Sequence, residues 1–229
     1  MSLFTDSVLI PSFIQENPSL IIHPLDHCKD PAMLNGYGAV LAGPGWGQAE
    51  DRPAVLRMLL EYSGGLVLDA DGIRLFASMT MTDAHVLHHS ASLIMTPHPG
   101  ELQVLYDASP AAVPGKRLLE SGPEEFLAIL EKLSIYYHAT IIAKSHVTWI
   151  VSPEKGCFAV DGMNPSLGVA GSGDVMAGMC AAFLGQGCTP LQAACNAVLV
   201  HRKAGEIARE ELGWYAAHEL IAYVGTALA

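Results

Sequence analysis

The sequence predicts an α/β fold, in which a mostly parallel central sheet carries helices on both faces. Short apolar runs, which suit buried strands, alternate along the chain with longer stretches whose apolar residues recur at helical spacing. Strands that alternate with helices pair in parallel, and their crossover helices cover the sheet. Turns rich in glycine or acidic residues close several of the apolar runs, which agrees with this architecture.

The first half of the chain predicts a repeated order of strand, turn and helix. Apolar residues recur at helical spacing after Pro53, which itself suits a first helical turn. The expected strands are residues 37–42, 66–68 and 93–95, preceded by short extended segments at 7–10 and 19–22, and the expected helices start near Pro53 and cover 73–77 and 102–106.

The second half continues this order and ends in helices. Residues 123–137 predict an amphipathic helix with acidic residues on its polar side, and residues 140–143 predict a strand. An antiparallel hairpin is expected after that strand, and it is followed by apolar helices. The hairpin strands are 148–152 and 157–161, two apolar helices follow residue 174, and a third helix covers 218–228.

Composition limits the classes of partner. A length of 229 residues without repeats or linkers suits a single domain over residues 1–229. The net charge of −11 disfavours nonspecific binding to nucleic acid or to an anionic membrane. An uncharged run from Val175 to His201 is broken at 185–190 into two apolar segments of ten residues. A membrane span needs roughly 20 residues. With no convincing signal peptide, we expect a cytoplasmic protein.

The cysteines and histidines do not predict a metal site. The five cysteines form no C-x-x-C pair, which is typical of reduced thiols. His85 and His88 are three residues apart and could share a helix face. Because no acidic or cysteine partner stands at a fixed offset from them, a solvated helix face is favoured over metal ligation.

Two glycine-rich turns are candidates for ligand binding, since sites in parallel sheets lie beyond the carboxyl ends of the strands. Gly171, Ser172, Gly173 and Asp174 precede an apolar helix, where backbone N–H groups and the helix dipole suit a phosphate. The alternative is a plain helix cap made by Ser172 or Asp174. The turn at 43–47 holds three glycines, which favours close passage of a ligand or of another backbone segment.

Further polar residues follow the other strands. Asp69 and Asp71 could hold Mg²⁺ through water, although a capping role for the next helix is favoured. His98 stands between two prolines, which would fix its imidazole. Glu101 lies in the first helical turn, where its carboxylate either interacts favourably with the helix dipole or reaches a metal through water. Lys144 could reach phosphate or extend to solvent.

Five motifs in order carry a resemblance to a known family. They are A-G-P-G-W-G at 42–47, L-V-L-D-A-D-G-I at 66–73, T-P-H-P-G-E-L at 96–102, A-K-S-H-V-T at 143–148 and A-G-S-G-D-V-M-A-G at 170–178. This order resembles the NAD(P)H-hydrate dehydratases, the nicotinamide repair branch of the ribokinase-like superfamily. The resemblance implies a ribokinase-like three-layer α/β/α sandwich. It also implies ADP- or ATP-dependent dehydration of the (S) form of hydrated NADH or NADPH.

The resemblance assigns roles to the matching positions. Asp174 would be the base that deprotonates the ring hydroxyl of the hydrate, and we expect the helix dipole to lower its pKa. Mg²⁺ would bridge the phosphates, with Glu101 as a water-mediated partner, and a homo-oligomer is expected. The hydrate would contact Gly45 or Gly47 and His98, and the nucleotide would contact Lys144, Ser145, His146, Val147, Thr148, Gly171, Ser172 and Gly173.

Two departures from the family pattern bear on function. Ser145 stands where the family usually has glycine, which predicts a slightly different nucleotide loop. Family members also carry a strand, a glycine-rich turn and a helix ahead of the point that matches Met1. The resemblance therefore implies an N-terminally truncated domain with low activity unless that part is restored or donated by a partner.

Two other functions remain open from the sequence. One is a ribokinase-like kinase of a small alcohol. The motif T-P-H-P-G-E at 96–101 is expected in the dehydratases and not in such kinases, so it distinguishes the two. The other is a noncatalytic nucleotide-binding remnant, which would bind ADP without turnover.

Overall fold

The computed structural model describes residues 1–16, 19–28, 30–154, 156–162 and 164–229. The strands are β1 (Ser2–Thr5), β2 (Ile21–Pro24), β3 (Ala39–Ala42), β4 (Gly65–Leu68), β5 (Ser92–Met95), β6 (Thr140–Ala143), β7 (Val147–Val151) and β8 (Cys157–Asp161). The α-helices are α1 (Ile10–Glu16), α2 (Arg52–Glu61), α3 (Ala70–Thr80), α4 (Pro99–Asp107), α5 (Pro123–Tyr136), α6 (Ser172–Gly185), α7 (Pro190–Leu212) and α8 (Ala217–Ala227). Short 3₁₀ helices cover Ser7–Leu9, Leu25–His27, Pro31–Gly36, Ala84–Leu87, Leu118–Glu120 and Pro165–Leu167.

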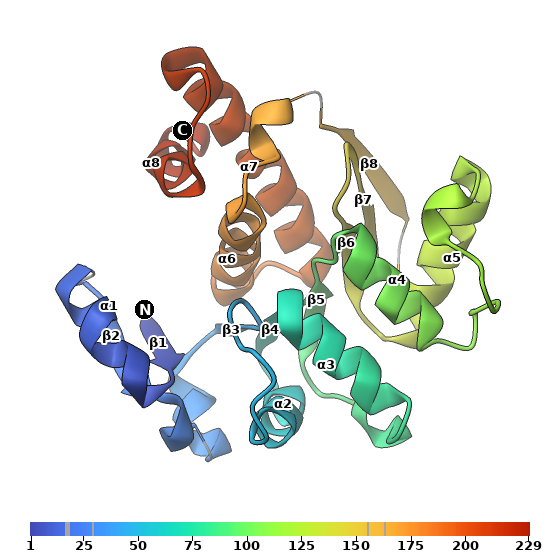
Figure 1. The fold of residues 1–229 in the computed structure, drawn as a ribbon, viewed down its shortest axis with the longest axis horizontal. Helices are drawn as coiled ribbons and strands as arrows, with labels where there is room; N and C mark the ends of the chain where they lie inside the picture. The colour runs from blue at the N-terminus through green and yellow to red at the C-terminus, as the bar shows by residue number, and fades with distance from the viewer. Residues whose placement is uncertain (17–18, 29, 155, 163) are drawn as a thin grey trace.

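The central sheet has the strand order β3-β4-β5-β6-β7-β8. Strands β3 to β6 are parallel, and β7 and β8 add to them as an antiparallel hairpin. The mostly parallel sheet and the hairpin expected from the sequence are therefore confirmed. Strands β1 and β2 form a separate parallel pair near the N-terminus (Figure 1).

Alternate residues of the strands pack against different helix layers. Leu66 and Leu68 belong to the core under α2 to α5, whereas Val67 lies in the core under α6 and α7. All three are fully buried, as a strand covered on both faces requires. Helix α8 packs on α7 around Ala204 and Leu220. The molecule is thus a three-layer α/β/α sandwich (Figure 1).

Most expected elements are confirmed, but the segment at 7–10 was wrong. It forms a 3₁₀ helix and the start of α1, and the strand lies earlier, at β1. Val8 and Leu9 are exposed, so this apolar run has no sheet to pack against. Helix α3 begins at Ala70, before the expected residue 73. Helix α7 continues well past the apolar run, and its later turns carry exposed ion pairs such as Arg202–Glu206.

The uncharged run from Val175 to His201 is divided between the two helices α6 and α7, as expected. No helix in the described ranges is long and apolar enough to cross a bilayer. The cysteines are free thiols, and Cys28 and Cys180 are buried. His85 and His88 are exposed, and no cluster of three potential metal ligands occurs among the described residues.

Candidate active site

The predicted site residues gather at the edge of the sheet where the parallel strands end. Residues 43–47 follow β3, Asp69 follows β4, His98 comes shortly after β5, and Lys144 directly follows β6. The start of α6 joins them, because a Cβ on Gly173 would lie 3.2 Å from Lys144 Nζ. Ligand sites of open α/β sheets lie at this edge.

The turn at 43–47 packs directly on the turn after β4. Gly43 has φ +123°, and a Cβ there would lie 1.8 Å from the carbonyl oxygen of Asp69, so only glycine is accommodated. The N–H of Gly47 donates to Asp71 Oδ2 at 2.9 Å. The expected close passage of another backbone is confirmed at Gly43, whereas Gly45 and Gly47 face open space.

Asp69 and Lys144 form an ion pair, with Nζ 2.8 Å from Oδ1. The side chain of Asp69 is 2% exposed and that of Lys144 is 20% exposed. The expected capping role of Asp69 was wrong, because its side chain makes no capping bond to α3 although the residue stands at the N-cap position. A buried carboxylate gains more from a charged donor than from a backbone N–H. Asp71, bonded to Gly47, is not a cap either.

The first turn of α6 leaves a backbone donor free. Gly171 adopts the left-handed conformation with φ +89° at the N-cap, and no side chain caps the helix. The Ser172 hydroxyl donates to Leu167 O at 2.6 Å. Within the described part of the chain the N–H of Gly173 has no acceptor. The capping interpretation of this motif is therefore wrong, and the turn offers an open N–H with the helix dipole behind it.

The pKa of Asp174 is raised above its ordinary value. Burial is the main cause, and the negative charge of Asp69 adds to it, while the positive charge of Lys144 opposes it. The expected lowering by the helix dipole was wrong, because desolvation of the carboxylate outweighs the dipole. A carboxylate with a raised pKa is a stronger base than an exposed aspartate.

His98 and Glu101 hold each other at the start of α4. His98 Nδ1 accepts from Gly100 N at 3.0 Å, and its Nε2 lies 3.0 Å from Glu101 Oε1. Glu101 Oε2 accepts from His98 N at 2.9 Å, which completes a capping box. The imidazole is thus fixed, as expected, with half of its surface exposed. Glu101 is buried with both oxygens bonded, and a water-mediated metal contact stays a prediction.

The predicted nucleotide loop connects β6 to β7. Ser145 and His146 are exposed, and Ser145 Oγ lies 3.2 Å from His146 Nδ1. Ser145 does not adopt positive φ, so this backbone position does not require glycine. Val147 and Thr148 are the first residues of β7. Lys144 N donates to the carbonyl oxygen of Pro97 at 2.9 Å, which ties this loop to the turn that carries His98.

Sequence reasoning missed one ion pair and one residue of this site. The sequence analysis did not predict the ion pair of Asp69 with Lys144. Both residues follow parallel strands and carry opposite charges, and this combination is the signal from which the pair could have been predicted. His201 of α7 gave no signal. Its ring hydrogen bonds to the backbone of Ser172, burial lowers its pKa to about 4, and its Nε2 is buried without a partner among the described residues.

Sequence comparisons point to one family. A family model described as NAD(P)H-hydrate dehydratase matches residues 1–225. A bifunctional NAD(P)H-hydrate repair enzyme of Gloeobacter violaceus is 35% identical over 196 residues, which cover 82% of this chain and 35% of that protein. An ADP-dependent (S)-NAD(P)H-hydrate dehydratase of Neisseria meningitidis is 30% identical over 191 residues, which cover 82% of this chain and 61% of that protein. The chain thus spans less than two thirds of these relatives.

Solved structures confirm the expected fold. An ADP/ATP-dependent NAD(P)H-hydrate dehydratase from Bacillus subtilis has a TM-score of 0.78 and 24% identity, and the match covers 99% of this chain and 79% of that one. A ribokinase-like superfamily protein from Enterococcus faecalis has a TM-score of 0.75 and 22% identity, with 99% and 76% covered. With the five motifs joined at one edge of a ribokinase-like sheet, and with the family model matching nearly the whole sequence, this chain belongs to the NAD(P)H-hydrate dehydratase family.

Proposed function

We propose that this chain dehydrates the (S) form of NAD(P)H hydrate, with ADP or ATP as phosphoryl donor, and so returns NADH or NADPH. The observation that carries the proposal is the convergence of Lys144, the free N–H of Gly173 and the carboxylate of Asp174 at one edge of the sheet. The names of the relatives support it. The Bacillus subtilis enzyme, moreover, was co-crystallised with ATP and Mg²⁺.

The phosphates of the nucleotide would bind at the start of α6. The N–H of Gly173 and the positive end of the helix dipole favour an anion there, and the Lys144 ammonium lies beside them. Asp69 holds that ammonium in place. The loop from Lys144 to Thr148 and the turn at Gly171 and Ser172 would then border the nucleotide.

Asp174 would act as the base. Its carboxylate takes the proton of the ring hydroxyl, the hydroxyl oxygen bonds to the terminal phosphorus, and the bond from phosphorus to the leaving nucleotide oxygen breaks. Phosphate then leaves the ring with its bonding electron pair, and loss of a ring proton forms the double bond of the nicotinamide. Gly45, Gly47 and the fixed imidazole of His98 would contact the hydrate from the neighbouring turns.

The residues of this edge suit a Mg²⁺ ion that arrives with the nucleotide. Among the described residues no three acidic, histidine or cysteine side chains form a metal cage, and both oxygens of Glu101 are bonded to His98. Mg²⁺ in such sites is held by phosphates, waters and one or two carboxylates. When bound, it would neutralise phosphate charge, with Asp174 or, through water, Glu101 beside it.

The substitution Asp174→Asn tests the proposal. Asparagine cannot accept the proton, so turnover should fall by a factor of about 10² to 10⁴. Stability should stay within about 1 kcal/mol, because Asp174 makes no capping bond. Turnover is followed by the recovery of NADH absorbance from the hydrate with ADP and Mg²⁺, and nucleotide binding by calorimetry.

Glu124→Gln is the matched control, since Glu124 is an exposed acid in the first turn of α5. It should leave turnover unchanged. Retention of more than about a tenth of the activity by Asp174→Asn would remove the base assignment. A folded wild-type chain that binds ADP but never turns over the hydrate would favour the noncatalytic alternative.

A further inference from the structure

The turn at 43–47 combines flexible residues with open surroundings. Gly45 and Gly47 have φ +65° and +63°, and a Cβ on either residue would meet nothing within 4 Å. Glycine accepts positive and negative φ with similar ease. The peptide group between Trp46 and Gly47 can therefore turn over with little change in the rest of the chain. A ligand that binds along such a turn meets two alternative surfaces unless the peptide group is held in place.

Two charged side chains hold this peptide group in one orientation. Arg52 Nε donates to the carbonyl oxygen of Trp46 at 3.0 Å, and the N–H of Gly47 donates to Asp71 Oδ2 at 2.9 Å. The peptide dipole thus has its negative end on a guanidinium and its positive end on a carboxylate. Hydrogen bonds to ionised groups are stronger than those between neutral groups. Turning the peptide group over would break both of them.

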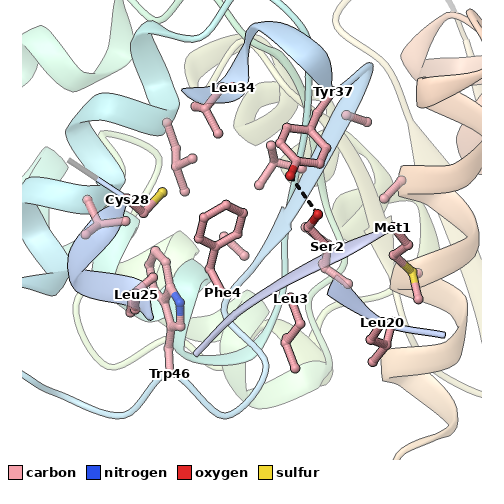
Figure 2. Close-up of a pocket in the computed structure, with 18 of the residues that line it drawn as sticks. Met1, Ser2, Leu3, Phe4, Leu20, Leu25, Cys28, Leu34, Tyr37 and Trp46 are labelled. Atoms are coloured by element: carbon pink, nitrogen blue, oxygen red, sulfur yellow. Dashed lines mark hydrogen bonds between the residues drawn. The ribbon is translucent and has the colours of Figure 1, made fainter. Parts of the chain in front are cut away.

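The carbonyl end of this peptide group is anchored in buried surroundings. The side chain of Arg52 is 4% exposed, and it also binds both carboxylate oxygens of Asp6, at 2.8 and 2.9 Å. Trp46 lines an apolar cavity together with Phe4 (Figure 2). Asp71, which holds the N–H end, is partly exposed. The orientation of the N–H of Gly47 therefore depends on a side chain that can be replaced without opening the core.

The backbone at Ala70 directs Asp71 toward this turn. Ala70 has φ +48°, a left-handed conformation that is unfavourable for a residue with a Cβ. The acids on its two sides bind different partners, because Asp69 contacts Lys144 whereas Asp71 accepts from Gly47. Strained residues persist where the surrounding structure fixes them, and they gather at functional sites. Here the left-handed residue directs two nearby carboxylates to two different loops of the site.

We propose that Asp71 is a positioning residue for the NAD(P)H hydrate, which acts through the peptide group between Trp46 and Gly47. By holding this group in one orientation, Asp71 keeps the turn in the shape that the hydrate contacts. The inference rests on the proposed function, because it takes the hydrate as the ligand of this turn. Asp69 and Asp71 then serve different halves of the site, the first through the lysine beside the phosphates and the second through the hydrate turn.

The variants Asp71→Ala and Asp71→Asn separate positioning from a general structural role. Alanine removes the acceptor of the N–H of Gly47, whereas the amide oxygen of asparagine still accepts it. Calorimetry with NADH hydrate, without nucleotide so that no turnover occurs, should show affinity lower by about tenfold or more for Asp71→Ala. Asp71→Asn should stay within about threefold of the wild type. The affinity for ADP, measured separately, should be unchanged in both variants.

Exchange of the Gly47 amide, followed by NMR without any ligand, tests the hydrogen bond itself. It should be faster by about tenfold or more in Asp71→Ala than in the wild type, because the N–H then lacks its acceptor. Asp83→Ala is the matched control, since Asp83 also accepts from a backbone N–H, that of His85 at 3.0 Å, in another turn. This control should change neither the exchange of the Gly47 amide nor the affinity for the hydrate.

Several results would overturn the inference. Unchanged hydrate affinity in folded Asp71→Ala would do so, as would equal losses for hydrate and ADP, which indicate general damage, or unchanged exchange of the Gly47 amide. A wild-type chain that binds ADP but not the hydrate would instead remove the proposed function, and the inference with it. If thermal denaturation shows that Asp71→Ala does not fold, Asp71→Leu replaces it, because leucine has a similar shape and no acceptor.

Discussion

Lys144→Met should destabilise the protein strongly, because it leaves the carboxylate of Asp69 buried without its cation. The Asp69 side chain is 2% exposed, and Lys144 Nζ is 2.8 Å from it. Removing one partner of a buried ion pair costs about 3–5 kcal/mol. Lys144 is itself 20% exposed, so water reaches the pair and the lower end of this range applies. The expected loss at pH 7 is about 3 kcal/mol.

The remaining two variants of a double-mutant cycle test the interaction between Asp69 and Lys144 most directly. Asp69→Asn should cost less than Lys144→Met, since the partly exposed ammonium can turn to solvent. The double variant should be more stable than Lys144→Met alone, because no uncompensated charge remains. Urea unfolding of the four proteins then gives a coupling energy, which for contacting charges lies at about 0.5–3 kcal/mol.

Two results would refute this reasoning. One is a Lys144→Met protein within about 0.5 kcal/mol of the wild type, as is usual for surface changes. The other is strict additivity in the cycle, which would mean that Asp69 and Lys144 do not interact in solution. In either case the lysine would not be held in place for phosphate by Asp69.

Three further outcomes follow from single contacts. Gly43→Ala should cost more than about 2 kcal/mol in urea unfolding, because its Cβ would lie 1.8 Å from the carbonyl oxygen of Asp69, whereas Gly45→Ala, in open space, should cost about 1 kcal/mol. Burial lowers the pKa of His201 to about 4 from 6.5, so its contribution to stability is present above pH 6.5 and is lost as the pH falls to about 4. That contribution is at most about 3 kcal/mol, and His201→Gln should flatten the stability profile over this window. Asp69→Asn removes a charge that raises the pKa of Asp174, so the acid limb of the pH profile of turnover should move to lower pH; an unmoved limb would contradict the coupling.

Strands β4 and β5 could be predicted because residues 66–68 and 93–95 are buried on both faces of the sheet. Residues 66–68 and 93–95 are apolar at every position, which only a buried strand or a buried helix tolerates, and their short length decides for strands. The N-terminal segment could not be predicted in the same way. Val8 and Leu9 are as apolar as the core strands, yet they are exposed, and nothing in their local pattern records that.

The sequence predicted which residues gather at the site, but it did not predict how their charged groups interact. Parallel strands bring the turns at their carboxyl ends together, so the motifs had to meet once the fold was known. Whether Asp69 caps a helix or pairs with Lys144 depends on which group lies closer across the sheet, and sequence spacing does not contain that distance. The direction of the Asp174 pKa depends in the same way on burial, which the dipole argument left out.

The charges of this edge explain how the proposed reaction would proceed. Lys144 is neutralised by Asp69, so with Asp174 ionised the three side chains together carry one net negative charge. Phosphates would then bind chiefly through the N–H of Gly173, the helix dipole and the cation that accompanies the nucleotide. Their negative charge would raise the pKa of Asp174 further and make it a still stronger base. Proton uptake from the hydroxyl would then remove the uncompensated charge at the moment when the new bond to phosphorus forms.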